Sequence, residues 1–81
     1  MKNKKYKFTK EVIEFFGIKF YRIEAIVDFK NVSKGEIGGF IEKEKNLDMS
    51  GNAWVSGNAR VSGDAQVSGD AQVFGDAWVS G

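Results

Sequence analysis

Residues 51–81 read GNAWVSGNARVSGDAQVSGDAQVFGDAWVSG, and a six-residue unit, G-[N/D]-A-x-V-x, runs through them without a gap. Within each unit, alanine and valine flank a variable residue, and this alternation is typical of a short strand with one buried face. The Gly-Asn and Gly-Asp pairs then supply corners, because both residue types tolerate a positive φ. The repeat therefore predicts a coil of short strands joined by corners.

The units A-W-V-S-G-N, A-R-V-S-G-D, A-Q-V-S-G-D and A-Q-V-F-G-D resemble the hexapeptide repeat of left-handed parallel β-helices. In that family a coil is a triangle with one hexapeptide per side, so the resemblance implies about 18 residues per turn. An 18-residue step back from Ala65 and Val67 reaches Leu47 and Met49, both apolar. We therefore expect KNLDMS (45–50) to be a degenerate first unit, and Ile41, six residues before Leu47, is a second candidate for the start of the coil.

The corner residues also follow the 18-residue step. No Asp falls on another Asp, and the expected pairs are Asn46 with Asp64, Asn52 with Asp70, and Asn58 with Asp76. Like charges directly opposite one another destabilise a ladder, so the change from Asn to Asp along the chain has a structural explanation. Single carboxylates at separate corners do not converge, and we predict no metal site.

Several predicted outward positions carry large or charged side chains. We predict that they form a partner-binding surface made of Trp54, Arg60, Phe74 and Trp78. The 18-residue step places Arg60 beside Trp78, where a stacked guanidinium and indole contribute about 0.5–1 kcal/mol at an exposed site. Exposed aromatic side chains that gather in a group mark contact sites. Packing beneath the N-terminal region is the alternative interpretation of the aromatic residues.

Residues 6–46 do not repeat. Aromatic and β-branched residues on both sides of Gly17 predict two or more strands with a turn near that glycine. A helix from Thr9 to Phe16 is the alternative. Further along, KGEIGGFIEKEKNL (34–47) predicts a turn at Lys34–Gly35 before the first repeat unit.

The motifs YRIEA-I-x-DF, KGEIGGFIEKE-x-NL and GNAWV, between Tyr21 and Val55, resemble small phage and prophage hexapeptide-repeat proteins of the transferase-like kind. The resemblance implies a β cap that covers the N-terminal end of the helix, as repeat arrays require. The predicted fold is thus all-β. It consists of a basic N-terminal β-strand or hairpin cap (1–44) and a short left-handed parallel β-helix of about two coils (45–81), in one continuous unit.

The composition excludes several kinds of chemistry. The 81 residues include no Cys and no His, so disulfides, thiolate or imidazole zinc sites, Cys nucleophiles and His bases are all ruled out. The acyltransferases among left-handed β-helices typically use a His, and we therefore predict no enzyme, no catalytic residue and no cofactor. No apolar run approaches the roughly 20 residues of a membrane span, so we expect a cytoplasmic protein with no membrane partner.

The charge is distributed unevenly along the chain. Residues 1–46 hold 11 Lys or Arg and 7 Asp or Glu, whereas residues 47–81 hold one Arg and four Asp. The basic N-terminal segment, which with its interleaved aromatic residues is a candidate nucleic-acid surface, contains Lys4, Lys5, Lys7 and Lys10. The alternatives are a solvated surface for the lysines and a core role for the aromatic residues.

The last repeat units carry no sequence that would protect a strand edge, such as a charged or proline-bearing tail. We therefore expect end-to-end dimerisation through residues 63–81, with a self-association surface made of Val67, Ala71, Val73, Ala77 and Val79. By analogy with small phage proteins, we predict a non-catalytic inhibitor that binds a defence or regulatory protein in the host cell. The alternatives are an assembly module of a phage particle and nucleic-acid binding through the basic segment.

Overall fold

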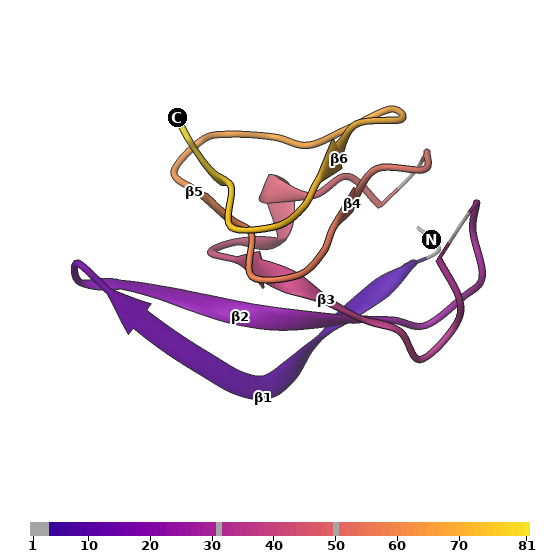
Figure 1. Cartoon of the computed structure of the whole chain (residues 1–81), viewed down its shortest axis with the longest axis horizontal. Helices are drawn as coiled ribbons and strands as arrows, with labels where there is room; N and C mark the ends of the chain where they lie inside the picture. The colour runs from indigo at the N-terminus through magenta and orange to yellow at the C-terminus, as the bar shows by residue number, and fades with distance from the viewer. Residues whose placement is uncertain (1–3, 31, 50) are drawn as a thin grey trace.

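The computed structural model describes residues 4–30, 32–49 and 51–81 (Figure 1). Among these residues the fold is all-β apart from the short 3-10 helix η1 (Glu44–Asn46), as predicted. The strands in chain order are β1 (Tyr6–Phe15), β2 (Ile18–Ala25), β3 (Ile37–Ile41), β4 (Trp54–Val55), β5 (Arg60–Ser62), β6 (Gln72–Val73) and β7 (Trp78–Ser80). No helix in the described part of the chain is long and apolar enough to cross a membrane.

The strands form two sheets. The larger sheet has the order β1-β2-β3-β5-β7, antiparallel from β1 to β3 and parallel from β3 to β7, and the smaller one pairs β4 with β6 in parallel. In Figure 1 the β1–β2 hairpin lies along one side of the molecule and the turns of the repeat segment lie on the other, with β3 between them. Strand β3 therefore joins the N-terminal region to the repeat.

The repeat segment returns on itself every 18 residues. Arg60 pairs with Trp78 across β5 and β7, and Val55 pairs with Val73 across β4 and β6. These registers confirm the step expected from the repeat. They also show that this part of the chain is a β-solenoid, in which successive layers stack through parallel strands.

The first layer departs from this step. Ile41 pairs with Val61, and Leu47 forms an isolated parallel bridge with Val67, so both steps are 20 residues. The expectation that Leu47 and Met49 lie under Ala65 and Val67 is therefore wrong. The chain passes through η1 between the two pairs, and this 20-residue register places fully buried Ile41 and Leu47 in the valine row of the interior. Of the two possible starts, the structure supports Ile41.

The turns of the N-terminal region follow the glycines. Phe16 and Gly17 have φ values of 53° and 77°, and they form the two-residue loop between β1 and β2. Two positive φ values are the signature of a type I′ hairpin turn. The turn predicted near Gly17 is thus confirmed, and the alternative helix from Thr9 to Phe16 is wrong. The turn predicted at Lys34–Gly35 is also present.

One hydrophobic core serves both regions of the chain. It includes Tyr6 and Ile23 from the hairpin, Ile41 from β3, and Val55 and Val61 from the solenoid. Gly38 brings β3 close to the solenoid, because a Cβ there would lie 2.6 Å from the Trp54 ring. The N-terminal region consequently packs as the first layer of the solenoid core.

Candidate functional site

The two ends of the solenoid differ in how their backbone groups are paired. At the end that faces the N-terminal region, alternate backbone carbonyls of residues 51–67 point toward that region and form a row, which we call the carbonyl row. Three backbone amides of the first layer bond to it, from Phe40 to Ala59 O (2.9 Å), from Glu42 to Val61 O (3.0 Å), and from Asp48 to Val67 O (2.9 Å). The remaining donors are side chains.

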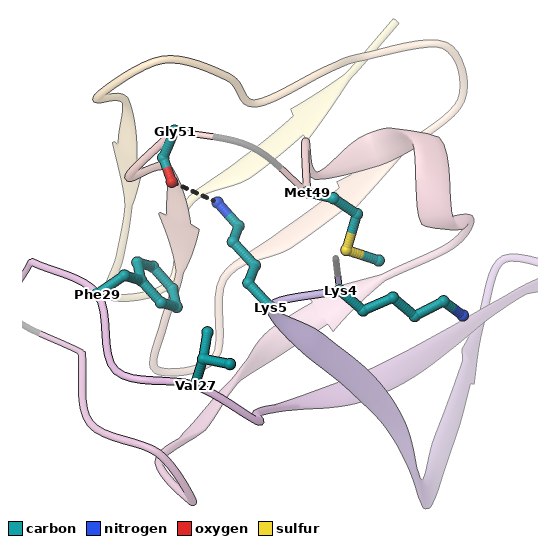
Figure 2. Close-up of a pocket in the computed structure, with 6 residues that line it drawn as sticks. All are labelled: Lys4, Lys5, Val27, Phe29, Met49 and Gly51. Atoms are coloured by element: carbon teal, nitrogen blue, oxygen red, sulfur yellow. Dashed lines mark hydrogen bonds between the residues drawn. The ribbon is translucent and has the colours of Figure 1, made fainter. Parts of the chain in front are cut away.

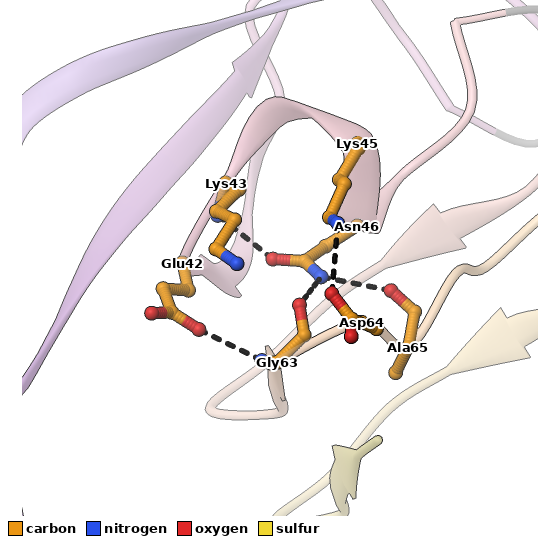
Figure 3. Close-up of polar contacts among 7 residues, drawn as sticks. All are labelled: Glu42, Lys43, Lys45, Asn46, Gly63, Asp64 and Ala65. Atoms are coloured by element: carbon orange, nitrogen blue, oxygen red, sulfur yellow. Dashed lines mark hydrogen bonds and ion pairs between the residues drawn. The ribbon is translucent and has the colours of Figure 1, made fainter.

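Asn46 is the most deeply embedded of these donors (Figure 3). Its amide Nδ2 donates to the carbonyls of Gly63 (3.1 Å) and Ala65 (2.8 Å), while its Oδ1 accepts from the Lys43 amide (2.7 Å). A buried amide with all three bonds made gives a fixed local geometry, since each of these groups would be costly to leave unpaired.

Two carboxylates lie beside Asn46 at the same corner (Figure 3). Glu42 accepts from the Gly63 amide (2.7 Å), and Lys45 pairs with Asp64 at 2.8 Å. The hydrogen bond and the charge of Lys45 lower the pKa of the exposed Asp64 carboxyl. The corner is thus held by both neutral and ionic contacts.

Lys5 is the second side-chain donor to the carbonyl row (Figure 2). Its ammonium lies 2.7 Å from Ala53 O and 3.4 Å from Gly51 O, and 4.9 Å from the centre of the Phe29 ring. The residue is only 4% exposed, and burial lowers the pKa of the ammonium although the nearby Asp48 charge opposes the shift. Its inclusion in an exposed basic surface was therefore wrong. The stem of Lys5 packs inside, and its charged end satisfies carbonyls.

The other residues of the predicted basic segment remain at the surface. Lys4 forms an ion pair with Glu44 at 3.3 Å, and Lys7 and Lys10 are exposed on β1. Lys4 and Lys5 also border a pocket of about 430 Å³ that is further lined by Val27, Phe29, Met49 and Gly51 (Figure 2). The first three residues of the chain, which belong to this segment, lie outside the described residues.

Tyr6 completes the contacts of the N-terminal region with η1. Its buried hydroxyl lies 2.8 Å from both Glu44 O and Leu47 O, at the start of η1 and directly after its end. Burial, reinforced by the charges of Glu44 and Asp48, raises the pKa of the phenol. Arg22 adds a longer bond from Nη2 to Gly57 O (3.3 Å) while it pairs with Glu11.

At the opposite end the solenoid is open. Strands β6 and β7 each have one neighbour, β4 and β5 respectively, so one edge of each is unpaired within the described chain. We call these two free edges together the C-terminal edge. A Cβ added at Gly51 would lie 2.9 Å from Gly69 O in the next layer, whereas one at Gly69 or Gly75 would have no atom within 4 Å. The corners of this last layer are therefore uncovered.

The residues predicted for self-association differ in burial from one strand to the next at this end. Val67 is buried, Val73 and Val79 are half-buried, and Ala71 and Ala77 are exposed. The interior of the solenoid thus becomes progressively more exposed toward its last layer. Their role in self-association stays a prediction.

A second feature is a group of aromatic side chains around the half-buried Arg60, which we call the hairpin-tip cluster. Its other members are the exposed Phe15, Phe16 and Trp78 and the buried Phe20. The guanidinium carbon of Arg60 lies 4.8 Å from the ring centre of Phe15 and 5.9 Å from that of Trp78. The predicted proximity of Arg60 and Trp78 is therefore present, as a cation–π contact.

The three phenylalanines bring the hairpin onto the solenoid. Phe15, Phe16 and Phe20 have ring centres 5.5, 6.2 and 6.2 Å from that of Trp78. A core role for the aromatic residues of this segment was the alternative interpretation, and it holds for buried Phe20 but not for exposed Phe16. The signal that could have identified Phe16 is its place directly before Gly17, where a tight turn would project it into solvent.

The other two residues of the predicted partner-binding surface, Trp54 and Phe74, are not part of this cluster. Trp54 is 2% exposed and packs edge-to-face against Phe29 at 5.4 Å, so its predicted place on an outer binding surface was wrong. The loop that follows β2 covers this face of the solenoid, which is the alternative given above. Phe74 is 69% exposed and remains a candidate contact residue.

Comparison with known proteins supports the solenoid. Residues 53–69 and 65–81 each match the family model described as the YdcK beta solenoid repeat. No curated protein matches the chain. The two repeat matches agree with the parallel, layered pairing of β4 to β7, and the chain is a protein of the β-solenoid type.

Proposed function

We propose that this chain is a non-catalytic protein-binding module that associates with a second copy of itself through the C-terminal edge. The observation that carries the proposal is the unpaired edge of β6 and β7 beside a partly open Ala/Val interior. Exposed strand edges readily pair with another chain, and charged or proline residues usually protect them. Gln72 and Val73 on β6, and Val79 and Ser80 on β7, provide no such protection.

A second copy is the occupant we propose because the two edges have compatible chemistry. Each copy offers unpaired main-chain groups, small side chains at Ala71 and Ala77, and half-buried valines at 73 and 79. Two copies related by a two-fold axis would cover these groups reciprocally. The combined core would then be closed at both outer ends by the N-terminal regions.

We infer further that the solenoid is left-handed, has about two coils, and belongs to the hexapeptide-repeat class found in small phage proteins. On that analogy, the proposed role is inhibition of a host defence or regulatory protein in the host cytoplasm. The absence of Cys and His supports a binding role over hydrolytic or acyl-transfer chemistry. A structural module of a phage particle is the second candidate, because an open solenoid end also suits assembly.

The direct test is the absolute mass of the 81-residue chain in solution, measured by light scattering over a concentration series. We expect a dimer. The double variant Ala71→Lys/Ala77→Lys should be monomeric and folded, since both alanines are exposed in a single copy but would be buried between two. Asn58→Lys, on an exposed corner residue one layer before Asp76, is the control and should leave the dimer intact.

Two results would contradict the proposal. A wild-type chain that stays monomeric over the whole series removes the second copy as the occupant of the edge. A double variant that remains dimeric places the interface elsewhere. For the host target, recovery of the chain alone from a host lysate argues against inhibition, and its presence in purified virions favours the assembly role.

A further inference from the structure

The side chain of Arg60 has no hydrogen-bond acceptor among the residues that the structure describes. Its Nε is buried and without a hydrogen-bond partner, and the guanidinium makes no ion pair with any described residue. Within the described part of the chain, its guanidinium makes cation–π contacts with the rings of Phe15 and Trp78. A buried polar group without a partner is destabilising, and such groups in folded proteins call for a specific explanation.

Phe16 is the second unexplained feature of the same cluster. It is 81% exposed and has φ 53°, at a turn position where Asn or Gly is the usual residue. A bulky residue held in this region of backbone space is strained. Its ring nevertheless stacks on Trp78 at an interplanar angle of 12°, so the two form a flat aromatic surface beside Arg60.

We propose that the hairpin-tip cluster is the docking site for an acidic side chain of the partner protein. Because Nε is buried, the carboxylate would bind the outer Nη nitrogens of the half-buried Arg60. The rings of Phe16 and Trp78 would contact the apolar residues next to it. Arginine and tryptophan surrounded by apolar contacts are the commonest centres of binding energy in protein interfaces. This inference rests on the proposed function only in that the chain binds another protein.

Charge complementarity favours a single carboxylate over a nucleic acid. Around the cluster Glu14 lies opposite Lys19 in the hairpin, and Arg22 is already paired with Glu11. A nucleic-acid strand requires several cations along its backbone, whereas this surface offers the one guanidinium of Arg60.

The chain contains its own controls for a test by nuclear magnetic resonance. It has two Trp and two Arg. Trp54 is buried under Phe29, and Arg22 is paired with Glu11, so their side-chain N–H signals should not respond to a ligand at the hairpin tip. The responding signals should be Arg60 Nε–H and the Trp78 indole N–H.

The probes are two capped tripeptides, acetyl-Phe-Asp-Leu-amide and acetyl-Phe-Asn-Leu-amide, titrated into the labelled full chain. We expect the Asp peptide to shift the Arg60 and Trp78 signals, and the Asn peptide to bind about tenfold more weakly because a charge-assisted bond is lost. Arg60→Gln should reduce the affinity for the Asp peptide by about the same factor. Phe16→Asn should also weaken binding while leaving the chain at least as stable, since Asn suits a positive φ.

Each contrary result overturns the site. Three results would show that Arg60 does not bind a carboxylate here. They are equal affinity for the two peptides, no shift of the Arg60 Nε–H and Trp78 indole signals, or shifts of the Arg22 and Trp54 signals instead. Tighter binding of a short oligodeoxythymidylate with the same shifts would make the cluster a nucleic-acid site. Self-association through the C-terminal edge is tested only by the mass measurement, so failure of one proposal can be told apart from failure of the other.

Discussion

The two ends of the solenoid show how the same repeat can be closed or left open. At the N-terminal end, the carbonyl row receives donors from Lys5, Arg22 and Asn46 and from three backbone amides. At the C-terminal end, β6 and β7 each have one edge that is unpaired within the described residues, and Ala71 and Ala77 are exposed. Closure therefore comes from a non-repeating segment whose side chains substitute for the amides of a further coil.

The difference teaches that a repeat does not terminate itself. Every repeat unit offers the same backbone groups to the next one, so an end is stable only when other groups satisfy them or another chain does. Here the first end uses buried polar side chains, which must all be paired because unpaired buried groups are costly. The closed end should consequently be intolerant of small polar changes, and the open end tolerant of them.

Replacement of Asn46 by Asp should have the largest effect. The change keeps the shape of the side chain but directs a carboxylate oxygen at the carbonyls of Gly63 and Ala65, in place of the amide that donates to both. We expect a loss of about 3 kcal/mol or more in the free energy of unfolding, measured by urea denaturation.

The matched control is Asn58→Asp. Asn58 is an exposed corner residue, and the substitution would likewise place an Asp 18 residues before another Asp, at position 76. It should cost far less, because water solvates both carboxylates. Equal losses in the two variants would mean that charge stacking at the corners, and not the bonds to the carbonyl row, determines stability.

Tyr6→Phe should have an intermediate effect. It removes the hydroxyl that bonds Glu44 O and Leu47 O and leaves the rest of the buried ring in place. We expect a loss of about 1–2 kcal/mol in the same urea measurement. Tyr21→Phe is the control, since Tyr21 is half-buried and stacks on Phe8. A loss as large at Tyr21 would show that the phenol of Tyr6 has no special role in closing this end.

The sequence predicts the regular part of the molecule well. The Ala and Val positions, the Gly corners and the turn at Gly17 follow from local chemistry. These features depend on periodicity and on which residues tolerate a positive φ, and both are readable along the chain. The 18-residue register from Trp54 onward was implied by the resemblance to hexapeptide-repeat β-helices.

The errors all involve contacts between the non-repeating region and the repeat. Lys5 reads as a surface charge, yet it donates to carbonyls 46 and 48 residues away. Trp54 has an outward position in its strand, yet a loop from before β3 covers it. Leu47 fits an 18-residue step but is displaced by two residues because η1 intervenes. Such long-range packing has no periodic signal, so the sequence could not identify these roles.

The smallest effect we expect is a pH dependence that belongs to the closed end. Burial lowers the pKa of Lys5 below its usual 10.5, so as pH rises toward 10 the folded chain loses this proton before the unfolded chain does. The unfolded state then binds more protons, and stability should increase with pH in this interval. Above pH 10 the raised pKa of Tyr6 acts in the opposite direction, because the unfolded phenol ionises first.

Urea unfolding at a series of pH values between 7 and 10 tests this expectation. Lys5→Gln keeps a neutral donor near Gly51 and Ala53 but removes the titrating group, so its unfolding free energy should rise less with pH than that of the wild type. Lys7→Gln, on an exposed residue of β1, should retain the wild-type slope. If the unfolding free energy of all three chains changes equally with pH, Lys5 keeps an ordinary pKa in the folded state. Its ammonium would then be solvated and not buried against the carbonyl row.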